Sequence, residues 1–268
     1  MKKRVLVSCS AKGGVPYYWF SSYDQMMRMD HPDYSFEFVM ESGNSAISIS
    51  RNIAAASAIE QKYWKLVQID KDQFWNPSQL IALVSRDEDI VAAPYVKKKS
   101  GPVSWLIVKT PGAEVREDGM LQCDFVGTGM LSTSVAALQH MVDFFPERRF
   151  DYEDEGGKTK SMTELFPIGL VGPNTPEGKL SRIALAGTFR EIQDILYTNV
   201  AVGGAGAGAR LLGEDYGFCH LARKSGFKLW CDTRQVVGHV GDVVYPVTPE
   251  ALSSPASIPT HSLCLDSF

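Results

Sequence analysis

The stretch Trp64–Asp72, which reads WKLVQIDKD, constrains the fold of this chain more than any other. Its apolar run from Trp64 to Ile69 is typical of a strand buried on both faces, as in parallel sheets. Asp70 and Asp72 follow at the strand end, where open α/β sheets place their ligands. In extended backbone, residues i and i+2 point the same way, so both carboxylates can meet one cation. Such oxygen ligands suit Mg²⁺ or Mn²⁺, and the alternative is an ordinary polar turn.

Composition places the chain among ordinary globular proteins and narrows its partners. Its 268 residues allow one large α/β domain or two small ones, with 44% hydrophobic and 22% charged residues. A net charge of −4 and a short basic cluster, Lys97–Lys99, argue against a nucleic-acid partner and suggest a solvated loop or a phosphate contact. Five scattered cysteines without CxxC favour reduced thiols. No apolar run approaches a signal sequence or the roughly 20 residues of a membrane span. We therefore expect a cytoplasmic protein, with peripheral membrane association left open.

Alternating strand and helix patterns fill the first part of the chain. The expected strands are Arg4–Ser8, Tyr34–Met40, Trp64–Ile69 and Ile90–Ala93, and the expected helices are Tyr17–Met29, Ser48–Glu60 and Pro77–Val84. Asn76 and Pro77 form a typical N-cap and first-turn pair. The loop Cys9–Pro16 does not read GxxxxGK[ST], which argues against a P-loop. The alternation predicts an α/β fold with a mostly parallel, Rossmann-like sheet flanked by helices.

The second half is less regular. We expect a turn at Gly127-Thr128-Gly129 and a mostly irregular insertion over Phe150–Thr175 with one short strand near Leu170. Gly203–Ala209 is rich in glycine and is predicted to be flexible. The expected strands are Val103–Lys109, Leu121–Phe125, Phe227–Cys231 and Gln235–His239, and the expected helices are Leu131–Phe144, Leu180–Tyr197 and Glu214–Lys224. We predict one domain over residues 1–245, with a donor-binding part at about 1–100, an acceptor-side part at about 101–245, and a Ser/Pro-rich tail at 246–268.

Four short motifs stand in a recognisable order. They are Asp70-x-Asp72, Phe125–Leu131 (FVGTGML), Gly213-Glu214-Asp215 at a helix start, and Val237–Val240 (VGHV). This order resembles the nucleotide-sugar glycosyltransferases of the GT-A fold. It is most similar to the family-2-like enzymes, the polypeptide N-acetylgalactosaminyltransferases and the mannosylglycerate synthases. The resemblance runs over roughly Arg4–Val240 as an order of elements, with sequence matches only in the motifs.

The resemblance implies a metal site and a pair of acidic residues. Asp70 and Asp72 fill the positions that hold a divalent cation, Mn²⁺ or Mg²⁺, together with the diphosphate and ribose of the donor. His239 fills the place of a third metal ligand. Glu214 and Asp215 match the acidic pair near the acceptor hydroxyl, which includes the base in inverting members. Neighbours at a helix start point about 100° apart, and the apolar stripe of this helix favours Asp215 as the inward one.

Further residues on the donor side follow from the same resemblance. Gly127-Thr128-Gly129 matches the loop beside the sugar, and Arg51 and Asn52 match a helix start near the donor. Arg51 is also unfavourable to the helix dipole in a first turn, which hints at an anion nearby. Ser8 begins the loop that would meet the nucleobase. Lys71, between the aspartates, departs from the family pattern and either pairs with phosphate or points into solvent.

The expected function is therefore metal-dependent transfer of a sugar from a UDP- or GDP-linked donor to a hydroxyl of a carbohydrate or another acceptor. One alternative is a sugar-phosphate nucleotidyltransferase, which would consume a nucleoside triphosphate. The other is an inactive nucleotide- or carbohydrate-binding protein of the same fold, which would show no product release with Mn²⁺. Whether transfer keeps or inverts the anomeric configuration stays open.

Overall fold

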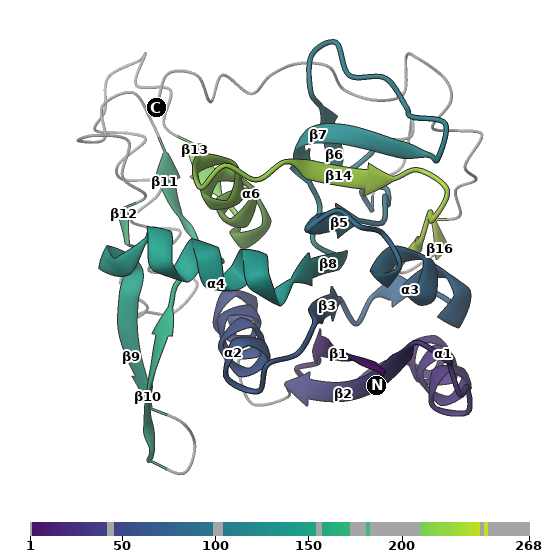
Figure 1. Ribbon diagram of the computed structural model, residues 1–268, viewed down its shortest axis with the longest axis horizontal. Coiled ribbons are helices and arrows are strands. Elements are labelled where there is room, and N and C mark those ends of the chain that lie inside the picture. Colours follow the sequence, from purple (N-terminus) through teal and green to yellow (C-terminus); the bar gives the residue numbers. More distant parts are fainter. Residues whose placement is uncertain are drawn as a thin grey trace.

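A mixed eight-stranded sheet forms the centre of the molecule (Figure 1), in the strand order β2-β1-β3-β8-β5-β14-β7-β6. The computed structural model describes residues 2–41, 46–98, 104–153, 157–171, 181–182, 210–241 and 244–245. The strands of the central sheet are β1 (Lys3–Ser10), β2 (Tyr34–Glu41), β3 (Lys65–Ile69), β5 (Ile90–Ala92), β6 (Ile107–Lys109), β7 (Met120–Val126), β8 (Met130–Ser134) and β14 (Leu229–Asp232).

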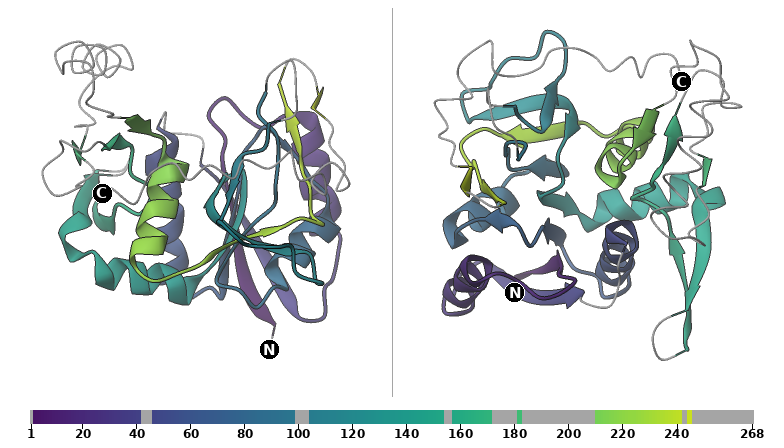
Figure 2. Two further views of the ribbon diagram at one scale, coloured as in Figure 1. Left: turned by 90° about the horizontal axis from the view of Figure 1, so that it is seen from above. Right: turned by 180° about the vertical axis from the view of Figure 1, so that it is seen from behind.

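Helices cover both faces of this sheet, so the fold has three layers (Figures 1 and 2). One face carries α1 (Tyr17–Met27) and α3 (Pro77–Val84), and the other carries α2 (Ile47–Glu60), α4 (Val135–Phe144) and α6 (Glu214–Lys224). Among the described residues, no helix is long and apolar enough to cross a membrane. The predicted α/β fold class, with a large central sheet flanked by helices, is confirmed.

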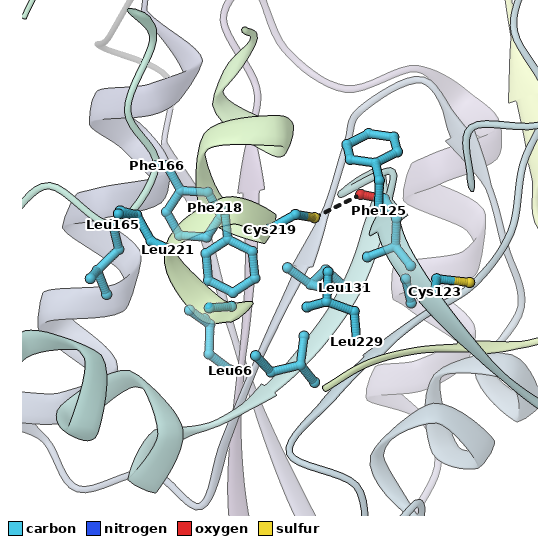
Figure 3. Close-up of a cluster of buried hydrophobic side chains, with 14 of the residues drawn as sticks. Leu66, Cys123, Phe125, Leu131, Leu165, Phe166, Phe218, Cys219, Leu221 and Leu229 are labelled. Carbon is cyan, nitrogen blue, oxygen red and sulfur yellow. Dashed lines mark hydrogen bonds between the residues drawn. The ribbon is translucent and has the colours of Figure 1, made fainter. Parts of the chain in front are cut away.

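Two hydrophobic cores form because side chains alternate across each strand. On β1, Val5 and Val7 pack toward α1 and α3, while Leu6 packs toward α2. The core beneath α2, α4 and α6 is drawn in Figure 3, where the rings of Phe166 and Phe218 stack with their centroids 4.5 Å apart. The strand β3 is buried along its whole length, as its sequence predicts.

The strand β8 corrects one prediction. Residues from Leu131 were expected to begin a helix, but Met130–Ser134 is a buried strand, and α4 starts only at Val135. The strand lies antiparallel between β3 and β5, so both of its edges are hydrogen-bonded. Ser134 ends it and caps the helix, accepting a hydrogen bond from the backbone N–H of Ala137 at 3.1 Å. The predicted parallel pairing is present among β2, β1 and β3. The strand β8 lies between β3 and β5 and is antiparallel to both.

The segment expected to be irregular contains a β-hairpin. Strands β9 (Arg149–Glu153) and β10 (Thr159–Thr163) pair antiparallel. The residues RFDYE of β9 alternate between exposed and half-buried positions, which is the period-2 signal of a strand. A further small sheet joins β12 (Ser181–Arg182), β11 (Gly169–Val171) and β13 (Arg210–Leu212).

These small strands bear on the remaining predictions for the second half. The helix predicted over Leu180–Tyr197 is wrong at Ser181–Arg182, and the rest of it lies outside the described residues. The predicted flexible stretch Gly203–Ala209 and the tail 246–268 also lie outside them. The division into donor-binding and acceptor-side parts stays a prediction, although the central sheet takes strands from both parts.

Candidate functional site

The predicted motifs meet at one edge of the central sheet. Strands β1, β3, β5 and β14 run in the same direction and β8 runs oppositely, so the carboxyl ends of β3 and β5 lie beside the start of β8. The backbone N–H of Asp70 donates to the carbonyl oxygen of Gly129 at 2.8 Å, and that of Ala93 donates to Met130 at 2.9 Å. The aspartate motif and the glycine motif, about 60 residues apart in sequence, are therefore hydrogen-bonded neighbours.

Asp70 and Asp72 lie on a turn rather than on an extended strand. The turn is closed by a hydrogen bond of 3.0 Å from the N–H of Gln73 to the carbonyl oxygen of Asp70. The strand ends at Ile69, so extended-strand geometry does not apply to Asp70 and Asp72, and the prediction that it aligns their carboxylates is wrong. The two side chains instead take different partners.

Asp70 pairs with Arg51, which is only 2% exposed. One guanidinium nitrogen of Arg51 donates to the Asp70 carboxylate at 2.8 Å, and another donates to the carbonyl oxygen of Thr128 at 3.0 Å. Arg51 Nε lies 3.8 Å from a carboxylate oxygen of Glu214. Burial raises the pKa of Asp70 to about 6, although Arg51 opposes this rise. Arg51 thus links the strand-end aspartate to the acidic pair on α6, and the anion hinted at by its position near a helix start is a carboxylate of the protein itself.

Asp72 lies against His239. Strand β15 (Gly238–Val240) pairs with β4 (Gln73–Phe74) and with β16 (Val244–Tyr245), which sets His239 opposite Gln73. His239 Nε2 is 3.5 Å from Asp72 Oδ2, and its Nδ1 is 2.6 Å from the carbonyl oxygen of Val96. A carbonyl only accepts, so Nδ1 carries a proton and Nε2 faces the carboxylate.

A lysine also binds Asp72. The ammonium of Lys98 donates to Oδ2, the same oxygen that His239 approaches. Burial disfavours the charge on Asp72, but its interactions with His239 and Lys98 outweigh this effect and lower the pKa of Asp72 to about 2. Asp72 is therefore held as a carboxylate at neutral pH.

The residues fit a divalent cation in part. Within the described ranges, no three His, Cys, Asp or Glu side chains are grouped so that they could hold a metal ion. What the fold brings together is the pair of Asp72 and His239, while Asp70 is turned to Arg51. A carboxylate and an imidazole whose Nδ1–H is fixed by a backbone carbonyl are a suitable pair of ligands, and the diphosphate of a donor would complete the coordination.

Tyr95 is a central residue of this site that the sequence analysis missed. Its hydroxyl accepts a hydrogen bond from the N–H of Gly129 at 3.1 Å, and its ring meets the ring of His239 edge-on, with centroids 5.0 Å apart. A Cβ atom at Gly127 would lie 2.6 Å from the hydroxyl oxygen, and one at Gly129 would lie 2.8 Å from the ring. The two glycines of the predicted sugar loop therefore make room for Tyr95. The Gly-x-Gly pair was a sequence signal for this contact, because glycine has no Cβ and lets a bulky side chain approach the backbone closely.

The acidic pair opens α6 beside this network. Asp215 Oδ1 accepts a hydrogen bond from the N–H of Tyr216 at 2.8 Å, and Glu214 lies near Arg51. Burial and the neighbouring charge of Glu214 raise the pKa of Asp215 to about 6. Burial, together with the charges of Asp70 and Asp215, raises the pKa of Tyr95. Such raised carboxyl pKa values are typical of groups that exchange protons near neutral pH.

Other predicted donor-side residues have structural partners. Asn52 Oδ1 accepts hydrogen bonds from the backbone N–H groups of Leu165 and Phe166, at 2.9 and 3.0 Å. Lys71 Nζ donates to a backbone carbonyl in the loop after β1 at 2.6 Å. Ser8 is 3% exposed within β1. Roles of these three residues in binding a donor stay predictions.

Comparisons with known proteins leave the family of this chain open. No family model matches the sequence, and no curated protein matches it. Among solved structures, A197 from STIV is similar over 51% of this chain and 67% of its own, with 17% identity and a TM-score of 0.35. A mannose-1-phosphate geranyltransferase from Thermus thermophilus is similar over 55% of this chain and 61% of its own, with 11% identity and a TM-score of 0.38. Similarity this low carries no argument about function, so the site must be interpreted from its own chemistry.

Proposed function

We propose that this chain is a metal-dependent glycosyltransferase that moves a sugar from a UDP- or GDP-linked donor to an acceptor hydroxyl. The observation that carries the proposal is that one network of side chains at this sheet edge connects a possible metal-binding pair with a pair of acidic residues. Asp72 and His239 form a carboxylate–imidazole pair close to Asp70, and Arg51 joins Asp70 to Glu214 at the start of α6. Sugar transfer must stabilise a departing diphosphate, and an inverting transfer must also take up the proton of the acceptor hydroxyl.

On the donor side, Asp72 and His239 would hold Mn²⁺ or Mg²⁺, which as a Lewis acid would offset the charge that develops on the departing diphosphate. The charge of Arg51 favours the ionised form of Asp70, and the Asp70 carboxylate would then meet the ribose or a water on the cation. The hydrogen bond from His239 to the carbonyl of Val96 keeps the imidazole in one tautomer and one orientation.

On the acceptor side, Asp215 is the proposed base if transfer inverts the configuration. A carboxylate whose pKa is about 6 holds a proton far better than an ordinary one, yet is mostly ionised at neutral pH. Glu214 forms an ion pair with Arg51, so we assign Glu214 a positioning role and not the role of the base. In a retaining transfer no base is needed, and Asp215 would bind acceptor hydroxyls instead.

The test is release of UDP or GDP from a panel of nucleotide sugars, measured with Mn²⁺, with Mg²⁺ and with a chelator. We expect release that depends on the metal. Asp215→Asn keeps the size of the side chain and its hydrogen bond to Tyr216 but removes its basicity. In an inverting enzyme it should lower turnover by about 10²–10⁴-fold and leave donor binding nearly unchanged.

Two outcomes would contradict the proposal. Release of pyrophosphate from a nucleoside triphosphate and a sugar phosphate would identify a nucleotidyltransferase. Donor binding without metal-dependent release from any nucleotide sugar, in the presence of a panel of acceptors, would leave a binding protein. Loss of activity in Glu214→Gln but not in Asp215→Asn would reverse the assignment of the acidic pair.

A further inference from the structure

The carboxylate of Asp72 is already paired with a cationic side chain of the protein itself. The ammonium of Lys98 is hydrogen-bonded to Asp72 Oδ2, and the two side chains are 32% and 34% exposed. His239 Nε2 approaches the same oxygen, at 3.5 Å. The lysine therefore stands at the oxygen that the proposed divalent cation would use.

The backbone just before Lys98 is paired with Ser104 and Trp105. The N–H of Lys97 donates to the carbonyl oxygen of Ser104 at 2.8 Å, and Val96 forms a bridge with Trp105. The carbonyl of Val96 in turn holds His239. The anchored backbone fixes where the lysine side chain starts, while its long flexible stem lets the ammonium move by several ångströms without any change in the backbone.

The Lys98 ammonium and a divalent cation would compete for Asp72 Oδ2. An ammonium and a metal ion that share one carboxylate oxygen would repel each other at close range, where the interaction between charges is strongest. A diphosphate that arrives with the metal offers the displaced ammonium a new anion, and charge-assisted hydrogen bonds to phosphate are strong.

We propose that Lys98 is a built-in competitor for the metal position and becomes a ligand of the diphosphate. A divalent cation displaces its ammonium from Asp72, and the freed ammonium then binds the phosphate oxygens of the donor. The second step rests on the proposed function, whereas the first requires only that a cation binds at Asp72 and His239. Lys98 would thereby make metal and nucleotide bind together rather than separately.

The experiment measures the affinity of Mn²⁺ alone by electron paramagnetic resonance, and then the affinity of UDP and GDP at saturating Mn²⁺ by calorimetry. The variant is Lys98→Gln, and Lys97→Gln is the matched control because it removes the same charge from the neighbouring exposed position. In Lys98→Gln, Mn²⁺ should bind about 2- to 10-fold more tightly, because its competitor is gone. The nucleoside diphosphate should bind about 10- to 100-fold more weakly, because a charge-assisted contact is lost.

The proposal predicts that Lys98→Gln strengthens Mn²⁺ binding and weakens binding of the nucleoside diphosphate. If Mn²⁺ affinity is unchanged or falls in Lys98→Gln, or if Lys97→Gln gives the same pair of effects, the role of Lys98 is refuted. The proposed function would survive that result, since the wild-type protein would still bind Mn²⁺ and nucleotide. If the wild-type protein and Lys98→Gln both fail to bind Mn²⁺ with and without UDP or GDP, the metal site itself is refuted and the proposal for Lys98 falls with it.

Discussion

The Asp215→Asn substitution should make the folded protein more stable at neutral pH while it removes the proposed base. Asp215 is partly buried beside Glu214, and its pKa rises from an ordinary value of 3.8 to about 6. Below about pH 4 the carboxyl is protonated in both the folded and the unfolded chain, so its burial costs no charge. Above about pH 6 it is ionised in both, and the folded chain bears the cost of the buried charge. Stability due to the neutral form is therefore lost as the pH rises from about 4 to about 6.

The magnitude follows from the same values. A rise from 3.8 to about 6 corresponds to at most about 3 kcal/mol, at ~1.4 kcal/mol for each tenfold change. Partial exposure screens the charge, so we expect about 1–3 kcal/mol. Asparagine stays neutral and keeps an oxygen that can accept the hydrogen bond from Tyr216. The variant should gain this stability over the wild type between about pH 4 and pH 6 and retain it at higher pH.

The assay is urea unfolding followed by tryptophan fluorescence at several pH values from 4.5 to 8, in parallel with thermal melting. A gain of this size raises the melting temperature by roughly 2–4 °C for each kcal/mol in a chain of this length. Asp143→Asn, on the exposed surface of α4, controls for the loss of one negative charge and should change stability by less than about 0.5 kcal/mol. Stability curves of the wild type and Asp215→Asn that run parallel across this pH range would refute the reasoning.

Three further predictions concern the surrounding network. Arg51→Met leaves Asp70 buried without its partner and should lower the free energy of unfolding by about 3–5 kcal/mol, whereas a loss below about 1 kcal/mol in urea unfolding would mean that the network is not structural. Gly129→Ala would place a Cβ 2.5 Å from Gln73 Nε2 and 2.8 Å from the ring of Tyr95, so it should cost about 1–3 kcal/mol, and an unchanged melting temperature would contradict this packing. His239→Ala should weaken Mn²⁺ binding in the presence of UDP or GDP by at least about 10-fold, and equal metal affinity in calorimetry would remove His239 from the metal site.

Local interactions were sufficient to predict several elements of this fold. The helix α3 begins and ends at the predicted residues. Its start is set by the cap residues Asn76 and Pro77, and its apolar face is formed by residues three or four positions apart, so both signals are local in sequence. The helix α6 likewise spans the predicted Glu214–Lys224. The strand β3 was identified by an apolar run that has to be covered on both faces.

Long-range pairing decided the rest. Residues Met130–Ser134 form a strand rather than a helix because β3 and β5 offer hydrogen bonds on both edges, and a short apolar run does not reveal such partners. The sequence also placed Asp70, Asp72 and His239 in one site, and the fold brings Asp72 and His239 within 3.5 Å of each other but turns Asp70 toward a different cation.

The sequence by itself thus determined the α/β class, the main alternation of strands and helices over Arg4–Ala93 and the strand end at which several predicted residues gather. Only the tertiary structure decided which charges face each other there. Arg51 reaches a carbonyl 77 residues away, and Lys98 reaches a carboxylate 26 residues away. Neither pairing leaves a local pattern, because the energy of an ion pair depends on distance and burial in space, and the chain sets these only after the sheet has formed.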